Sequence, residues 1–233
     1  CLNGVAWYLS VQAFLYAIFP SLLAVLKKAD ARRLRCIAAV IFCAQCLFSL
    51  AVWKAGLSGK AAFYLTYLCP VFRAGDFTIS CCMGCLYHNR KRENTLPGGA
   101  FSLLELAAVL FAGGCLFIAA KQVGVLGAVA FRYNVLFTPS AVLLVWLLAV
   151  GKGVISRLLS TKPFLWLARL SPYGFLIHQV LIRYMEWTAD KFSLTVHPVV
   201  WTLTVYLLTL CLSSFYKALE RRMRQHRTKV SAQ

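Results

Sequence analysis

The chain has 233 residues, of which 61% are hydrophobic and 14% are charged. Soluble domains carry about 25% charged residues, so this composition excludes both an ordinary water-soluble fold and an intrinsically disordered chain. The 25 Lys and Arg residues far outnumber the 7 Asp and Glu residues, but they lie in short clusters between apolar stretches. Such clusters are typical of cytoplasmic loops and of contact with anionic lipid. We therefore expect membrane lipids, and no nucleic acid, as partners.

The apolar stretches are long enough to cross a hydrocarbon core of about 30 Å. They predict an all-α, polytopic transmembrane helical bundle with about seven membrane segments. We expect one domain over residues 1–216 and a basic tail over residues 217–233. The third segment holds Pro70, which removes a backbone donor and predicts a kinked or broken helix. The segments are 5–26, 36–53, 62–87, 103–120, 133–150, 164–185 and 198–216.

The basic residues between these segments predict the orientation of the chain. Seventeen of them fall in one alternating set of loops and only five in the opposite set. Because positively charged loops stay in the cytoplasm, we expect residue 1 outside and the C-terminus in the cytoplasm, in a plasma (inner) membrane crossed several times. An odd number of crossings that starts outside fits a chain without its first helices. The first residue, Cys1 in place of an initiator methionine, agrees with this expectation.

Ten cysteines raise the question of a metal site. Cys43 with Cys46, and Cys82 with Cys85, have the CxxC spacing of zinc ligands. Both pairs lie in apolar flanks without a neighbouring histidine pair, at different depths of their segments. We therefore interpret these cysteines as small buried side chains and expect no metal.

Charged residues inside the predicted segments are the main candidates for function, because an ionisable group in lipid is costly. Arg73 and Asp76 lie three residues apart, so on a helix they share a face and can pair. Two interpretations follow: a structural ion pair, or candidate catalytic residues in which the guanidinium faces an anionic group or a developing oxyanion. Glu105 lies near the start of its segment, where a helix N-terminus favours a carboxylate, and we interpret it as structural.

Uncharged polar residues form a second group of candidates. Gln12 and Tyr16 lie four residues apart in the first segment, with Trp7 near its outer end, and His178 lies in the apolar run of the sixth segment. Each has an ordinary structural interpretation, as an interfacial aromatic residue or as hydrogen-bonding between helices. Gln12, Arg73 and His178 are nevertheless placed at similar depths, about 10–17 Å from the outer surface. This agreement predicts a shared cavity.

Three motifs built from these residues occur in order along the chain. Together they resemble the motifs of the membrane acyltransferase 3 family, which includes O-acetyltransferases of bacterial surface polysaccharides. Gln12 stands where the family has Glu, and Phe175 where it has Tyr. The motifs are Asn3-x3-Trp7-Tyr8-Leu9-Ser10-Val11-Gln12-x-Phe14-x-Tyr16, Pro70-x2-Arg73-x2-Asp76-Phe77, and Ser171 through Phe175-Leu176-Ile177-His178.

The resemblance implies an integral membrane enzyme that moves an acyl group, typically acetyl, from acyl-CoA to a hydroxyl of a cell-surface glycan or lipid-linked sugar. Arg73 and Asp76 would then be catalytic. Asn3, Trp7, Gln12, Tyr16 and His178 would be substrate-binding. The family has about ten helices and a histidine near its start, so we expect this chain to match the last seven helices and to lack a complete site on its own.

A polytopic transporter or flippase-like protein for lipid-linked saccharides is the alternative function. In such a protein the same polar residues would bind and pass the substrate without chemistry.

Overall fold

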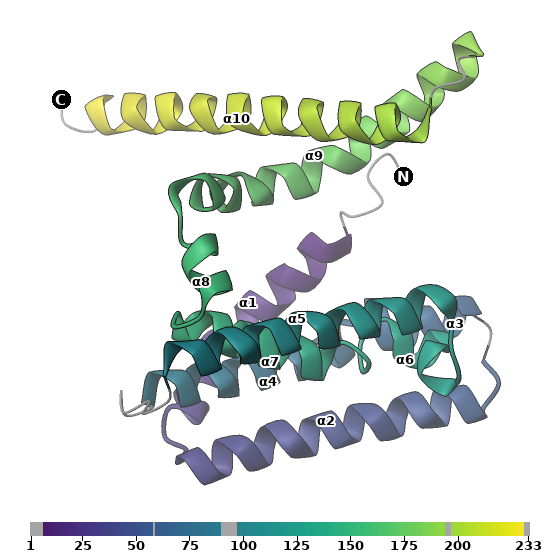
Figure 1. Cartoon of the computed structure of the whole chain (residues 1–233), viewed down its shortest axis with the longest axis vertical. Helices are drawn as coiled ribbons and strands as arrows, with labels where there is room; N and C mark the ends of the chain where they lie inside the picture. Colours follow the sequence, from purple (N-terminus) through teal and green to yellow (C-terminus); the bar gives the residue numbers. More distant parts are fainter. Residues whose placement is uncertain (1–6, 58, 90–96, 194–196, 231–233) are drawn as a thin grey trace. The chain divides into compact units, whose positions relative to one another are not determined.

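The computed structural model describes residues 7–57, 59–89, 97–193 and 197–230, and within these ranges the chain forms helices and turns without any strand (Figure 1). The helices are α1 (Trp7–Leu26), α2 (Ala31–Lys54), α3 (Gly59–Phe63), the π-helix η1 (Tyr64–Leu68), α4 (Pro70–Asn89), α5 (Gly98–Lys121), the 3-10 helix η2 (Val125–Gly127), α6 (Val129–Arg132), α7 (Thr138–Val150), α8 (Val154–Leu159), α9 (Lys162–Phe192) and α10 (Pro198–Val230).

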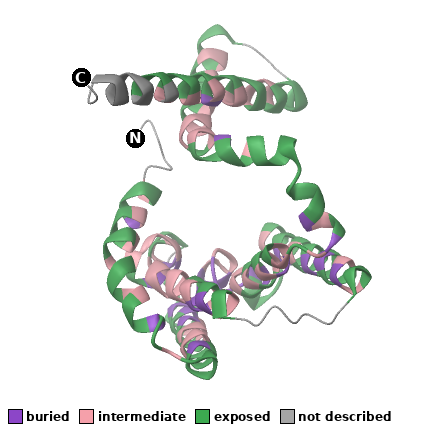
Figure 2. Cartoon of the chain, turned by 90° about the vertical axis from the view of Figure 1, so that its left-hand side faces the viewer, coloured by how far each residue is buried: buried purple, intermediate pink, exposed green. Residues whose placement is uncertain are grey.

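The chain forms two compact units, which are described separately. One comprises residues 10–159; in it α2 packs against α4, α5 packs against α7 and α8, and α4 contacts α7. The other comprises residues 1–9 and 160–233, with α9 packed along α10. Figure 2 shows that the buried residues lie where the helices of a unit face one another, while residues on the outward faces are exposed.

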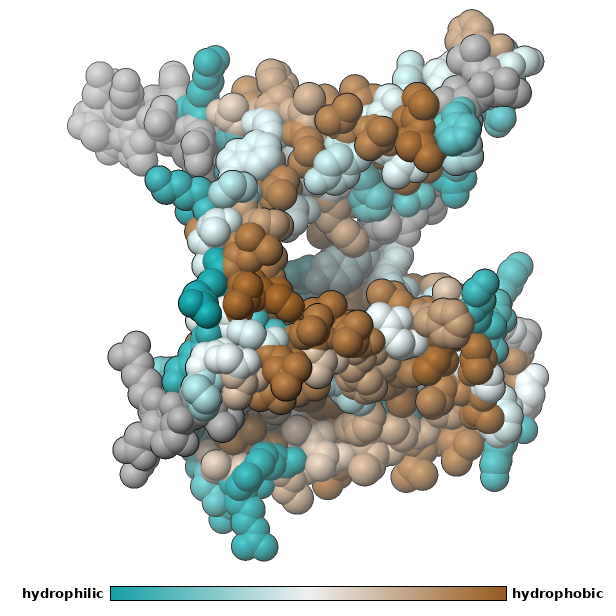
Figure 3. All heavy atoms as spheres, viewed as in Figure 1, coloured by the Kyte–Doolittle hydropathy of each residue, from teal (hydrophilic) through white to brown (hydrophobic). Residues whose placement is uncertain are grey.

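The outward faces are apolar, as expected for helices in lipid. Among the described residues, four helical stretches are long and apolar enough to cross a membrane: Trp7–Leu26, Ala31–Lys54, Gly98–Lys121 and Pro198–Glu220. In the unit of residues 10–159, hydrophobic residues cover much of the visible surface and hydrophilic ones gather toward the ends (Figure 3). The all-helical membrane class is therefore shown.

The other three predicted segments are helical but less simple. Segment 62–87 is divided among α3, η1 and α4, and segment 133–150 contains only the shorter apolar helix α7, because residues 133–137 form turns. Segment 164–185 lies within the 31-residue helix α9. The count of seven crossings stays a prediction.

The break in the third segment lies at Pro70, as the sequence predicts. Cys69 has an extended backbone (φ −61°, ψ 121°), the conformation favoured for a residue that precedes proline. Before it, the π-helix ends with a bond from Cys69 N to Tyr64 O of 2.8 Å. After it, Pro70 starts α4 without needing a backbone donor. The break thus leaves carbonyl groups near Tyr67 open to partners other than the next helical turn.

Glu105 is structural, but the helix that it stabilises is α8 and not its own. Glu105 lies on α5 and is fully buried. Its Oε2 accepts hydrogen bonds from Ile155 N (2.9 Å) and Ser156 N (3.3 Å), while Ser102 Oγ accepts one from Val154 N (3.2 Å). The first backbone donors of a helix have no partners within it. Two side chains one turn apart on α5 supply those partners here.

The cysteines near the C-terminal end of α4 pack as small apolar side chains. Cys82 and Cys85 are buried in a cluster with Leu26 and Leu34. Cys43, by contrast, is exposed on α2. Among the described residues there is no group of three or more His, Cys, Asp and Glu side chains that could hold a metal.

Candidate functional site

The break before α4 creates the setting for Arg73. Tyr67 O accepts a hydrogen bond of 2.8 Å from Arg73 Nε. The Arg73 guanidinium also lies over the Tyr67 ring, with its carbon 4.3 Å from the ring centroid, a distance at which cation–π attraction is effective. Arg73 is therefore held by a backbone carbonyl that a continuous helix would have used internally.

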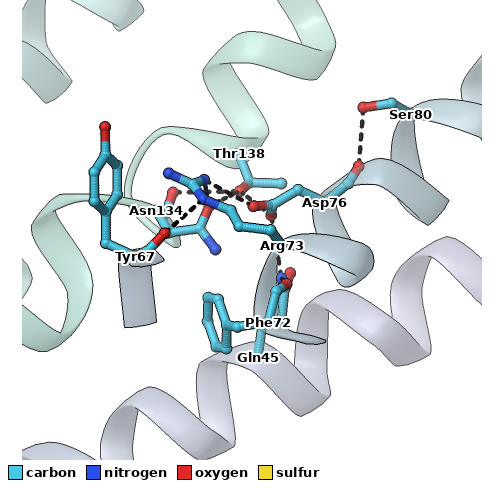
Figure 4. A network of polar contacts seen from close by, with 8 residues as sticks. All are labelled: Gln45, Tyr67, Phe72, Arg73, Asp76, Ser80, Asn134 and Thr138. Atoms are coloured by element: carbon cyan, nitrogen blue, oxygen red, sulfur yellow. Dashed lines mark hydrogen bonds and ion pairs between the residues drawn. The ribbon is translucent and has the colours of Figure 1, made fainter. Parts of the chain in front are cut away.

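The predicted ion pair between Arg73 and Asp76 is formed. Arg73 Nη1 lies 3.0 Å from Asp76 Oδ2, and the two side chains are 21% and 23% exposed. They share one face of α4 because they lie three residues apart. The same Nη1 lies 3.4 Å from Asn134 Oδ1. Figure 4 shows the guanidinium between Tyr67, Asp76 and Asn134.

Gln45 on α2 supports this pair and was not a candidate from the sequence. Its Nε2 donates to Asp76 Oδ1 (3.1 Å) and to Phe72 O (3.0 Å), and the residue is buried. The amide fits because Gly75 has no side chain; a Cβ there would lie 2.7 Å from Gln45 Nε2. Asp76 is thus held from both sides, by Arg73 and by Gln45.

Asn134 and Thr138 complete the network from the start of α7, and the sequence reading missed both. Thr138 Oγ1 lies 3.2 Å from Asn134 O and 3.5 Å from Asp76 Oδ1. Asn134 is only 4% exposed. Their spacing of four residues at the edge of an apolar segment is the same signal that singled out Gln12 and Tyr16.

These residues lie at one end of a cavity of about 440 Å³ between α4 and α7. Arg73, Asp76, Asn134 and Thr138 form its polar end. The cavity follows both helices to Tyr87, whose Oη donates a 2.6 Å hydrogen bond to Ala149 O. Between these ends its walls are mainly apolar, formed by residues such as Ile79, Met83, Val142 and Trp146.

Gln12 and Tyr16 pair with each other outside this cavity. Gln12 Nε2 donates a 2.6 Å hydrogen bond to Tyr16 Oη on α1. Neither residue lines the Arg73 cavity, so the structure does not bring Gln12 to Arg73. Asn3, the first residue of the same motif, lies outside the described residues.

Trp7 and His178 belong to the second unit. His178 Nδ1 lies 3.0 Å from Gly174 O, one turn earlier on α9, and its ring centroid is 5.9 Å from that of Phe175. Phe175 in turn packs edge-on against Tyr8, at 5.3 Å between centroids. Trp7 packs edge-on against Tyr8 at 6.1 Å. The first and third motifs therefore meet within this unit through Tyr8 and Phe175.

Replacing Gln45 tests whether the support of Asp76 matters. Gln45→Met keeps the volume but removes both hydrogen bonds, so Asp76 and Arg73 can shift. Misplacement of a reacting group by about 1 Å can cost up to ~10² in rate. If Arg73 acts on a substrate, we expect the rate of that reaction to fall by roughly that factor, with normal amounts of protein in the membrane. Gly75→Ala, which pushes on the same amide, should act in the same direction, and an unchanged rate in both variants would contradict this role.

Comparison with known proteins places the chain in a family. Residues 2–217 match the model of the acyltransferase 3 family, described as an acyltransferase domain. The match covers all three motifs and runs through both units. Neither a curated protein nor a solved structure matches the chain. The match covers most of the sequence, and the chain therefore belongs to the acyltransferase 3 family.

Proposed function

We propose that the protein is an integral membrane acyltransferase that moves an acyl group, in the simplest case acetyl, from acyl-CoA to a hydroxyl of a cell-surface glycan or lipid-linked sugar. Family membership supports acyl transfer over the transport of lipid-linked saccharides. The observation that carries the proposal is the position of Arg73, a guanidinium held by Asp76 at the polar end of an otherwise apolar cavity.

The reaction requires stabilisation of negative charge on the acyl carbonyl oxygen. The acceptor hydroxyl oxygen attacks the thioester carbon, its proton passes to a general base, and the carbonyl oxygen becomes an oxyanion. The C–O bond of the new ester forms, the C–S bond breaks and CoA leaves as a thiolate. A fixed donor in a site of low polarity stabilises such an oxyanion strongly. Arg73 would take this role, and its ion pair with Asp76 would orient it.

The acceptor would contact residues of the first and third motifs. Gln12 and Tyr16 on α1 offer an amide and a hydroxyl group. Trp7 offers an aromatic face and His178 an imidazole, and Asn3 would add a second amide. Such groups suit a polyhydroxylated acceptor, because each can donate to or pack against a sugar.

The direct test uses membranes that contain the full-length protein and acetyl-CoA labelled in its acetyl group. We expect label to enter the glycan or lipid-linked sugar fraction as an ester that mild base releases. Membranes from cells without the protein give the background. Absence of labelled ester, with the protein present in the membrane at normal amounts and with the host's own glycans as acceptors, would contradict the proposal for acetyl transfer.

The topology is testable independently of activity. From the distribution of basic residues we expect residues 27–35 and 217–233 in the cytoplasm and residues 54–61 outside. Single cysteines at positions 32, 57 and 224 in a cysteine-free background can be treated with a reagent that does not cross the membrane. Position 57 should react in intact cells, and positions 32 and 224 only after the cells are opened. Labelling of position 32 or 224 in intact cells would reverse the orientation.

A further inference from the structure

We propose that the cavity between α4 and α7 binds the acyl group itself, with the carbonyl oxygen at Asn134 and Arg73 and a hydrocarbon tail along the apolar walls. The inference rests on the proposed function and deepens it. It adds Asn134 as a second donor to the acyl carbonyl, and it makes an acyl chain longer than acetyl the preferred group.

At the polar end of the cavity, within the described part of the chain, the carboxylate oxygens of Asp76 are occupied while hydrogen-bond donors are left over. Asp76 Oδ2 is taken by Arg73, and Asp76 Oδ1 lies within hydrogen-bond distance of Gln45 Nε2 and Thr138 Oγ1. Asn134 Nδ2, by contrast, is buried without a hydrogen-bond partner in the described part of the chain. Such a buried, unpaired donor is unusual in folded proteins, and it indicates a missing acceptor.

The orientation of the Asn134 amide follows from its neighbours. Arg73 has only donors, so the Asn134 atom 3.4 Å from Arg73 Nη1 is the carbonyl oxygen. The NH₂ group of Asn134 therefore remains for a ligand. Within the described residues Arg73 uses Nε and Nη1 in its hydrogen bonds, which leaves Nη2 as well. Two donors on residues that line one cavity suit an oxygen acceptor such as a carbonyl or oxyanion.

The rest of the cavity suits a hydrocarbon chain. From Arg73 to Tyr87 the wall of α4 extends about 21 Å, at 1.5 Å per residue. The two α4 hydroxyl groups that line the cavity already donate hydrogen bonds, Ser80 Oγ to Asp76 O at 2.9 Å and Tyr87 Oη to Ala149 O at 2.6 Å. Between the polar end and Tyr87 the walls are mainly apolar, so they suit a hydrocarbon chain better than a sugar with many hydroxyl groups. A cavity of about 440 Å³ falls in the range of sites for ligands much larger than an acetyl group.

Small side chains of α7 leave room in the tail region of the cavity. Ala141 lines the cavity, whereas Leu143 on the same helix does not and is 42% exposed. Ala141→Trp should therefore fill the tail region, and Leu143→Trp places the same side chain outside the cavity. Asn134→Asp keeps an oxygen toward Arg73, removes the NH₂ donors and adds a negative charge, and the last two changes both disfavour an oxygen acceptor.

The experiment measures binding of CoA, acetyl-CoA and octanoyl-CoA to the full-length protein in lipid nanodiscs. We expect the wild type to bind octanoyl-CoA at least tenfold more tightly than acetyl-CoA. Ala141→Trp should abolish this preference while acetyl-CoA binding persists, which also shows that the variant is folded. Leu143→Trp should keep the preference. Asn134→Asp should weaken both acyl-CoAs at least tenfold relative to CoA alone.

The contrary results are distinct. Equal binding of the two acyl-CoAs by the wild type, or a preference that survives Ala141→Trp, would overturn the tail assignment. Unchanged acyl-CoA binding by Asn134→Asp would overturn the carbonyl assignment. Either result leaves acyl transfer standing. Failure of all three CoA compounds to bind would instead contradict the proposed function and this inference together. A separate experiment tests whether membrane lipid fills the cavity: crosslinking of a photoreactive nanodisc lipid to Met83 in the presence of octanoyl-CoA would assign the cavity to lipid and overturn the inference.

Discussion

Arg73→Lys in the full-length protein is expected to lower acyl transfer by about 10²–10³, the usual cost of losing one oxyanion donor. Arg73 bonds to Tyr67 O through Nε and to Asp76 and Asn134 through Nη1. A lysine ammonium is a point charge without this planar arrangement. Even if the substituted lysine pairs with Asp76, it cannot also present a fixed donor to the cavity.

The measurement is esterification of the acceptor in cells or membranes, with the amount of membrane protein as the folding control. Arg183→Lys is a matched control, because Arg183 and Glu186 form another pair three residues apart, with side chains 60% and 49% exposed. That variant should keep its activity. The double variant Arg73→Met with Asp76→Leu separates a structural role of the pair from a functional one, because buried ion pairs often tolerate apolar replacement without loss of stability. If this double variant or Arg73→Lys retained near-normal transfer, the pair would be purely structural.

The sequence was most informative where composition decides the structure. Apolar stretches predict helices because backbone polar groups in lipid need partners within the chain, and every predicted segment contains helix. Pro70 marked the break, and the spacing of Arg73 and Asp76 predicted their pairing. These features are local, so one sequence is enough to infer them.

The partners of the pair could not be inferred in this way. Gln45 is 31 residues from Asp76, and Asn134 is 61 residues from Arg73. A polar residue in an apolar run signals that it has some partner, but the packing of α2 and α7 on α4 selects which one. Asn134 was also obscured by the start of its predicted segment at residue 133, where the chain forms turns and α7 begins only at Thr138.

Glu105 is another residue whose partners are distant in sequence and could not be inferred from it, and the structure predicts that its replacement has a large effect on stability. Glu105→Met removes the acceptor for Ile155 N and Ser156 N. Each buried donor left without a partner costs about 1–3 kcal/mol, so a loss of several kcal/mol and a clear drop in Tm are expected. Glu105→Gln retains one carbonyl oxygen and should cost much less. Equal losses in the two variants, measured by thermal unfolding in detergent, would mean that the negative charge matters rather than the hydrogen bonds.

Gly153 tests the same contact from the opposite side. A Cβ at Gly153 would overlap the Glu105 carboxyl group, so Gly153→Ala should displace that group and weaken the start of α8. Because both substitutions act on one contact, their effects should not add. Glu105→Ala removes the group that the new Cβ would meet, so in the Glu105→Ala background Gly153→Ala should lower Tm much less than it does alone. Gly84→Ala is the control, since a Cβ there meets no atom within 4 Å. If the losses in Tm of the two single variants added fully in the double variant, α8 would depend on Gly153 for a reason unrelated to Glu105. The capping of α8 by α5 would then not explain the stability of this part of the unit.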